Sequence, residues 1–290
     1  MKEANKGAIQ MKLASFTYKN KESFGVVTDD GVIDLKKKLD NQYEDLKTFL
    51  ENNGTEKVNI ETDKIDYSLE QIEFLPVISN PSKIICVGLN YHEHVKEVGR
   101  EKSVDPVIFL WVANSQTGHQ NDLLIPPESS MFDFEGEIAV IIGKKGRRIK
   151  EEEAMNYVAG YSCYNDGSIR DWQLRNDQWT PGKNFDGTGS FGPWMVTRGE
   201  IKDEDVLTLE TRVNGEVMQK STTEMLIFPI KELIAFISTF TTLNPGDVIV
   251  TGTPGGVGMK RKPQSFLKDG DTVEIEVSKI GTLVNKVKAE

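Results

Sequence analysis

The sequence predicts a mixed α/β, β-rich fold with a mostly antiparallel core, and three observations support this prediction. Strand-like apolar runs outnumber helical patterns, and their alternation with helices is irregular. Hairpin signals such as Asn214-Gly215 fall between the expected strands. A doubly wound parallel sheet would require regular strand–helix alternation, so we expect a mixed sheet that carries a few helices.

The chain has 290 residues, which is enough for one large domain and a small one. Residues 1–10 are polar and without pattern, and we expect them to be disordered. We expect a small N-terminal α+β domain over 11–78 and a catalytic domain over 79–290. In the small domain, we expect two short strands at 12–18 and 25–28, followed by the segment Gly-Val-Ile-Asp-Leu at 31–35 and a helix at 43–51.

In the larger part, apolar runs of about four to eight residues predict strands, and apolar residues at helical spacing predict helices. The expected strands are 83–88, 106–111, 134–143, 159–165, 207–213, 247–251 and 272–277. The expected helices are 91–98, 150–157 and, most clearly, 230–240.

Composition excludes several classes of function. The balance of 35 basic and 45 acidic residues gives a net charge of −10, and no basic block lies beside aromatic residues, so we expect no nucleic-acid partner. No apolar run approaches the roughly 18 residues of a membrane span, and no signal peptide is visible. Two cysteines, Cys86 and Cys163, lie in apolar runs and cannot form a zinc cluster. These observations predict a cytoplasmic protein without a membrane partner.

Acidic residues at alternating positions of one expected strand are the most informative feature. Asp133, Glu135 and Glu137 share a face that becomes apolar further along, and inward carboxylates need a cation or a partner. Asp166 lies 29 residues after Glu137, at the end of another expected strand. Three oxygen ligands without nearby His or Cys suit Mg²⁺ or Mn²⁺. The alternative is a solvated polar face on an edge strand.

Two of the three histidines fall on the helix expected at 91–98. His94 and Glu97 are i, i+3 neighbours there, so the carboxylate can orient the imidazole for general acid–base catalysis. The alternative is an exposed helix with an incidental His/Glu pair. His119 fits a loop histidine better than a catalytic one.

Two cations and a glycine-rich segment complete the set of candidate functional-site residues. Arg170 and Gln173 follow Asp166 at i+4 and i+7, and they share a face if a helix begins there. Arg170 and Lys183 suit substrate carboxylates, although each alone is commonly a surface cation. The segment 251–258 lacks the Gly-Lys-Ser/Thr of a phosphate loop. We expect it to present amides to an anionic ligand, with a plain glycine-rich turn as the alternative.

Taken together, these segments resemble the fumarylacetoacetate hydrolase family over residues 83–290, and the leading unit resembles that family's variable N-terminal domain. The motifs that carry the resemblance are Ile-Ile-Cys-Val-Gly-Leu-Asn-Tyr at 84–91, the Asp-x-Glu-x-Glu strand, Asn-Asp-Gly-Ser-Ile-Arg-Asp at 165–171, Gly-Lys-Asn-Phe at 182–185, Val-Asn-Gly-Glu at 213–216 and Thr-Gly-Thr-Pro at 251–254. Many members have lysine where this chain has Trp111, so the pocket wall of those relatives is not a guide to its substrate.

The resemblance implies a β-roll-like catalytic domain, a homodimer and a bound Mg²⁺ or Mn²⁺. The implied site residues are Glu135, Glu137 and Asp166 as metal ligands, His94, Glu97 and Lys183 as catalytic residues, and Arg170, Gln173 and Thr253 as substrate-binding residues.

The resemblance also implies a small 2-oxo acid as substrate. We expect C–C bond cleavage, either acylpyruvate hydrolysis or oxaloacetate decarboxylation, through a metal-stabilised enolate. The alternatives are tautomerisation of a 2-hydroxyhepta-2,4-diene-1,7-dioate, sugar-acid chemistry, and a non-catalytic metal- and oxo-acid-binding protein. Specificity is expected within 98–120 and 174–182.

Overall fold

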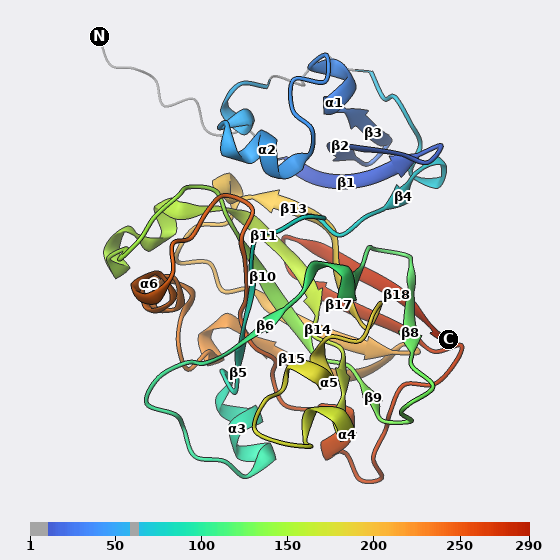
Figure 1. The fold of residues 1–290 in the computed structure, drawn as a ribbon, viewed down its shortest axis with the longest axis vertical. Helices are drawn as coiled ribbons and strands as arrows, with labels where there is room; N and C mark the ends of the chain where they lie inside the picture. The colour runs from blue at the N-terminus through green and yellow to red at the C-terminus, as the bar shows by residue number, and fades with distance from the viewer. Residues whose placement is uncertain (1–10, 59–63) are drawn as a thin grey trace.

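The computed structural model describes residues 11–58 and 64–290, so the disorder expected for residues 1–10 lies outside the described part. Two β-sheets pack together, and the leading unit both adds strands to the larger sheet and covers one of its faces (Figure 1). The mixed, β-rich fold class is confirmed. Among the described residues, no helix is long and apolar enough to span a membrane.

The larger sheet has eleven strands within the described ranges and contains both parallel and antiparallel pairs. Its order is β3 (Gly31–Asp34), β2 (Lys21–Thr28), β1 (Lys12–Tyr18), β13 (Gly189–Thr197), β11 (Val158–Asn165), β10 (Gly136–Ile142), β16 (Val248–Val250), β5 (Ile84–Gly88) and β6 (Val107–Trp111), with β4 (Glu73–Phe74) beside β1 and β7 (Gln116–Thr117) beside β13.

The second sheet has five strands and packs against the first. Its order is β15 (Glu216–Thr222), β14 (Thr208–Val213), β17 (Thr272–Val277), β18 (Gly281–Ala289) and β8 (Asp122–Ile125), while β9 (Phe132–Asp133) pairs separately with β12 (Ser168–Ile169). The hairpin predicted at Asn214-Gly215 joins β14 to β15, and both turn residues have the positive φ that such turns require.

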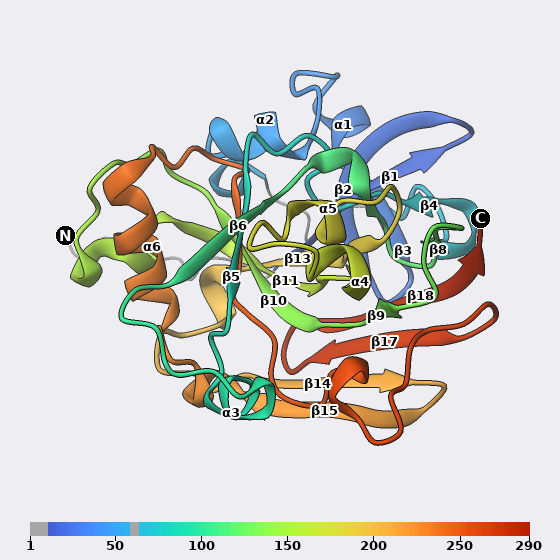
Figure 2. The ribbon, with the colours of Figure 1, turned by 60° about the horizontal axis from the view of Figure 1, so that its bottom comes forward.

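Short helices connect the strands, and α3, α4 and α5 lie in the lower part of Figure 1, which is turned toward the viewer in Figure 2. The α-helices are α1 (Leu35–Lys38), α2 (Leu46–Glu51), α3 (His92–Val98), α4 (Arg170–Gln173), α5 (Thr180–Lys183) and α6 (Ile230–Phe240). The 3₁₀ helices are η1 (Gly54–Glu56), η2 (Leu69–Gln71), η3 (Ala113–Ser115), η4 (Glu151–Tyr157), η5 (Arg198–Glu200), η6 (Thr223–Met225) and η7 (Gly258–Lys260).

Strand β10 is buried on both faces because successive side chains point to opposite sides of the sheet. Ile138 and Val140 pack into the core shared with the five-stranded sheet. Ala139 and Ile141 pack into a second core shared with the leading unit, whose Phe24 and other apolar residues cover this face. A polar side chain at the end of β10 is therefore enclosed from both directions.

The leading unit continues the larger sheet, because β1 pairs antiparallel with β13. Lys12 and Leu13 lie opposite Val196 and Met195. The division expected between residues 78 and 79 stays a prediction.

The structure also departs from the expected elements. The strand expected at 134–143 begins only at Gly136, because β9 ends at Asp133 and residues 134–135 break the ladder. The helix expected at 150–157 is the 3₁₀ helix η4. No expected element covers strands β4, β7, β8, β9, β12, β13 and β18, and only the hairpin signal at Asn214-Gly215 indicated β15.

Candidate metal centre and active site

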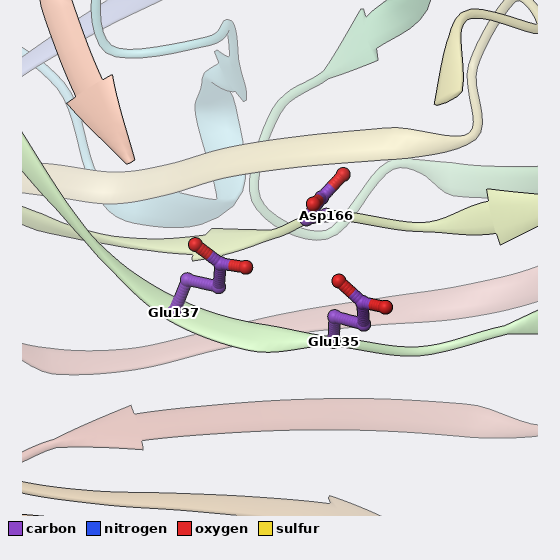
Figure 3. A group of neighbouring side chains, drawn as sticks. All are labelled: Glu135, Glu137 and Asp166. Carbon is purple, nitrogen blue, oxygen red and sulfur yellow. The ribbon is translucent and has the colours of Figure 1, made fainter. Parts of the chain in front are cut away.

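Three carboxylates meet at the end of the β10–β11 ladder. In this ladder Gly136 lies opposite Asn165, so the residues just outside the pair, Glu135 and Asp166, are neighbours. The Asp166 amide donates a hydrogen bond to the Glu135 carbonyl at 2.9 Å. Glu135, Glu137 and Asp166 each offer a ligand oxygen within 4.8 Å of the others (Figure 3). All three side chains are buried.

Two buried cations neutralise part of this charge. Lys183 Nζ lies 2.9 Å from Glu135 Oε2 and 2.6 Å from Asp166 Oδ2, and Arg170 Nη1 lies 2.6 Å from Glu135 Oε1. Burial alone would raise the pKa of Glu135, but Lys183 and Arg170 outweigh it and hold that pKa well below its ordinary value. Burial likewise disfavours the charged Lys183, yet Asp166 and Glu135 raise its pKa.

For the other two carboxylates the nearby cations do not outweigh burial. Burial raises the pKa of Glu137 well above its ordinary value, and Asp166 and Glu135 add to the shift. Within the described residues, the Glu137 side chain accepts one hydrogen bond, from the Gly252 amide at 2.6 Å. Burial also raises the pKa of Asp166, to about 7, despite the opposing effect of Lys183. Buried carboxylates with raised pKa values either stay protonated or ionise together with a further positive charge.

A divalent metal ion would supply this positive charge. The donor set is all oxygen, as Mg²⁺ and Mn²⁺ prefer, and a divalent cation would offset the burial and the mutual repulsion that raise the pKa of Glu137 and Asp166. The buried acidic group therefore fits a divalent ion.

Trp111 completes the surroundings of Asp166. Its indole Nε1–H donates to Asp166 Oδ1 at 2.7 Å, and its ring packs edge-on against Tyr164. The sequence marked Trp111 only as a departure from relatives. The structure makes it a direct partner of a candidate metal ligand.

Arg170 is fixed by a neighbour whose role the sequence did not reveal. Its Nε donates to Asp133 Oδ2 at 2.8 Å, and its Nη1 donates to Gln173 Oε1 at 2.8 Å on the same short helix. Asp133 does not join the acidic group, because the break before Gly136 disturbs the alternation. It accepts amide hydrogen bonds from Gly258 and Met259 instead.

The expected dyad is formed on α3. His94 is buried, and its Nδ1 lies 3.2 Å from Glu97 Oε2. Glu97 Oε1 accepts a hydrogen bond from the Gly256 amide at 3.0 Å. When Nδ1–H donates to Glu97, Nε2 is left as the basic atom of His94. His92, on the same helix, is exposed.

The glycine-rich segment has a different task from the one expected. Its amides bind the protein's own carboxylates: Gly252 holds Glu137, Gly256 holds Glu97, and Gly258 holds Asp133. Gly256 has φ +107°, and a Cβ there would collide with the Met218 carbonyl, so only glycine fits. One segment thus positions both the acidic group and the dyad.

A cavity of about 200 Å³ joins the dyad to the acidic group. His94, Glu135 and Glu137 line it, together with Arg170, Gln173, Lys183 and Thr253 from the predicted set. The remaining lining residues are Gly88, Leu89, Val98, Arg100, Phe109, Leu174, Trp179, Met259 and Lys260. The ranges expected to set specificity contribute Val98, Arg100, Phe109, Leu174 and Trp179. Leu89, Met259 and Lys260 carry no local sequence signal.

Comparisons with known proteins show the family to which the chain belongs. The family model described as fumarylacetoacetate (FAA) hydrolase C-terminal matches residues 83–288. Over 218 residues the chain is 47% identical to a protein of Rattus norvegicus named oxaloacetate tautomerase Fahd2a, mitochondrial, covering 75% of this chain and 70% of that protein.

Solved structures are similar over nearly the whole chain. Fumarylacetoacetate hydrolase from Exiguobacterium antarcticum superposes with a TM-score of 0.82 at 32% identity, covering 97% of this chain and 100% of that one. The 2-hydroxyhepta-2,4-diene-1,7-dioate isomerase from Mycobacterium marinum gives a TM-score of 0.74 at 31% identity, covering 97% and 99%.

Proposed function

Since this chain belongs to the fumarylacetoacetate hydrolase family and is an enzyme, we propose that it moves a proton on a small 2-oxo diacid with the help of Mg²⁺ or Mn²⁺. The observation that carries this proposal is one cavity lined by both the His94 imidazole and the carboxylates of Glu135 and Glu137. Such a site combines a base with a place for a cation.

The metal would be held by Glu135, Glu137 and Asp166. When bound, it supplies Lewis-acid stabilisation of the negative charge that develops on the substrate's oxygens. Lys183, in contact with both Glu135 and Asp166, keeps these two carboxylates oriented and adds a fixed positive charge at the same end of the cavity.

The dyad performs the proton transfer. Glu97 accepts from His94 Nδ1–H, fixes the tautomer and supports the charge that the ring gains. His94 Nε2 then exchanges a proton with C3 of the substrate. In the enol-to-keto direction C3 gains a proton and the C2 hydroxyl loses one.

Arg170 and its neighbour Gln173 bind one of the two carboxylates of the substrate. Arg170 Nη2 is buried and has no hydrogen-bond partner among the described residues, so it is a free donor on a side chain that lines the cavity. Asp133 holds the rest of the guanidinium in place. A substrate carboxylate satisfies this donor, which burial would otherwise leave unpaired.

The first candidate reaction is keto–enol tautomerisation of oxaloacetate or a similar 2-oxo diacid. The name of the rat relative supports it, and it requires only the transfer described above. The second candidate is the C–C bond cleavage expected from the sequence, by acylpyruvate hydrolysis or oxaloacetate decarboxylation, because the same electron sink serves both reactions. Isomerisation of a 2-hydroxydienedioate, the activity for which the Mycobacterium marinum protein is named, uses the same proton transfer.

The test follows oxaloacetate by ultraviolet absorbance for its enol and by a coupled assay for pyruvate, with Mn²⁺ and then with excess chelator. We expect metal-dependent tautomerisation, which His94→Asn lowers by about 10²- to 10⁴-fold while Mn²⁺ binding persists. The exposed His92→Asn on the same helix is the matched control. Full activity in His94→Asn would remove the dyad from the mechanism, and metal-dependent pyruvate formation would favour the second candidate.

The resemblance also supports a homodimer. Leu110, at the end of edge strand β6, and Val112 just beyond it are exposed apolar side chains, which a second copy of the chain would cover. Light scattering after gel filtration measures the mass that decides this. A cytoplasmic location stays a prediction, since the rat relative is named as mitochondrial.

A further inference from the structure

The cations that line the cavity fall into two kinds. Arg170 and Lys183 are buried, and their charges are already paired with Asp133, Glu135 and Asp166. Arg100 and Lys260 are exposed, and neither side chain has an ion pair or hydrogen bond with any residue in 11–58 or 64–290. Two positive charges at the cavity therefore remain available to a ligand.

These two cations lie on segments that the fold ties together. Arg100 follows Gly99, the residue that ends α3, and Lys260 ends η7, just beyond the glycine-rich segment. The hydrogen bond from the Gly256 amide to Glu97 joins these segments three and four residues before the two cations. Arg100 and Lys260 thus line the cavity from two segments that this hydrogen bond joins.

Apolar side chains also line the cavity. Leu89, Val98, Phe109, Trp179 and Met259 contribute its non-polar wall, and the Phe109 and Trp179 rings pack edge-on at 5.5 Å. The lining therefore has an acidic group with paired cations, an apolar wall and a pair of unpaired cations. Its chemistry matches a molecule with a chelating 2-oxo carboxylate, a short carbon chain and a second anionic group.

We propose that Arg100 and Lys260 bind the distal carboxylate of a 2-oxo dicarboxylate and so make the site selective for diacids over monoacids. The inference rests on the proposed function and narrows it, because an acylpyruvate with an uncharged acyl end leaves both cations without a partner. Ion pairs at an exposed rim are individually weak, so the two cations together should contribute roughly five- to tenfold in affinity.

Two inhibitors that differ only at the distal end provide the test. Both 2-oxoglutarate and 2-oxopentanoate carry the 2-oxo carboxylate, but only the first has a distal carboxylate. Titration calorimetry on the Mn²⁺-loaded full chain measures their dissociation constants. We expect 2-oxoglutarate to bind about five- to tenfold more tightly, and the double variant Arg100→Gln/Lys260→Gln to reduce this ratio to about one. Affinity for 2-oxopentanoate should stay within about twofold.

Lys262→Gln is the control, since it removes a nearby exposed positive charge that does not line the cavity. It should keep the wild-type ratio. An unchanged ratio in the double variant, or an equal loss in the control, would overturn the proposal.

The experiments distinguish a failure of the proposed function from a failure of the distal subsite. If neither inhibitor displaces oxaloacetate and no metal-dependent turnover occurs, the function itself is wrong. If turnover is present and the inhibitor ratio does not depend on Arg100 and Lys260, only the distal subsite is wrong.

Discussion

The Trp111 indole donates a hydrogen bond of 2.7 Å to Oδ1 of Asp166, while Lys183 occupies Oδ2 of the same carboxylate. Both oxygens of this candidate metal ligand are thus held by buried side chains. Partners of this kind orient a ligand before the ion arrives.

Replacing Trp111 with Phe should weaken Mn²⁺ binding by about 10- to 100-fold, because Asp166 loses the donor that fixes its orientation. Titration of the metal measures this directly. Trp194→Phe is a matched control, since the Trp194 indole makes an equally short hydrogen bond, to the Ile280 carbonyl. Equal affinities in the two variants would show that Trp111 only fills space.

Neutralising Glu135 and neutralising Glu137 should have opposite effects on the stability of the metal-free protein. In metal-free protein at pH 8, Glu135→Gln takes from Arg170 and from Lys183 one of their two carboxylate partners, leaving Asp133 and Asp166 respectively, and should lower the unfolding free energy by about 3 kcal/mol. Glu137→Gln removes a carboxylate whose raised pKa shows that its charge is costly, so stability should stay equal or rise. Both variants should lose Mn²⁺ binding. Chemical denaturation in the presence of chelator measures the stability of both variants. A Glu137→Gln variant less stable than Glu135→Gln would contradict this prediction.

Glu97 has two separable tasks, because one oxygen orients His94 and the other accepts the Gly256 amide. In Glu97→Gln the carbonyl oxygen can keep the bond to Gly256, but the amide cannot support a charged imidazole. We expect kcat to fall by about 10²-fold with little change in KM. Glu97→Ala loses both contacts and should also raise KM. Identical kinetics for the two variants would mean that the bond to Gly256 has no effect on the site.

His119 should make stability depend on pH. Burial lowers its pKa from 6.5 to about 4, and its Nδ1 accepts the Val284 amide, so the folded protein holds it neutral. Between these two values the unfolded chain binds the extra proton, and stability therefore falls as pH falls. From pH 7 to pH 5 the loss should be about 2 kcal/mol. Denaturation curves for His119→Asn should show a smaller loss over this interval. If the unfolding free energy of His119→Asn changes with pH as steeply as that of the wild type, other groups control the pH dependence.

The sequence predicted the parts of the fold that local pattern determines. The strand expected at 12–18 is β1, and the helix expected at 230–240 is α6, because both have clear apolar periodicity. Strand β13 was missed because it contains two glycines and Pro193, which are unfavourable in strands. Its pairing with β11 shifts register between Tyr161 and Cys163, opposite the segment that carries Pro193, and the neighbours on both sides keep it in the sheet.

Part of the site could also be predicted, because some of its residues lie close together in the sequence. The i, i+2 and i, i+3 spacings of Glu135 with Glu137 and of His94 with Glu97 are visible in the sequence, and the structure brings each pair together. Asp133 with Arg170, and Trp111 with Asp166, are separated by 37 and 55 residues. Only the tertiary fold makes such contacts, so no local spacing reveals them.

The pairing of β1 with β13 has a consequence for how the molecule unfolds. Detaching residues 11–78 would break a ladder inside the larger sheet and expose the apolar face that carries Ala139 and Ile141, on the same strand as Glu137. The two parts should therefore melt in a single cooperative transition. A chain shortened to residues 79–290 would be prone to aggregate, because the leading unit covers the apolar face of the strand that carries Glu137.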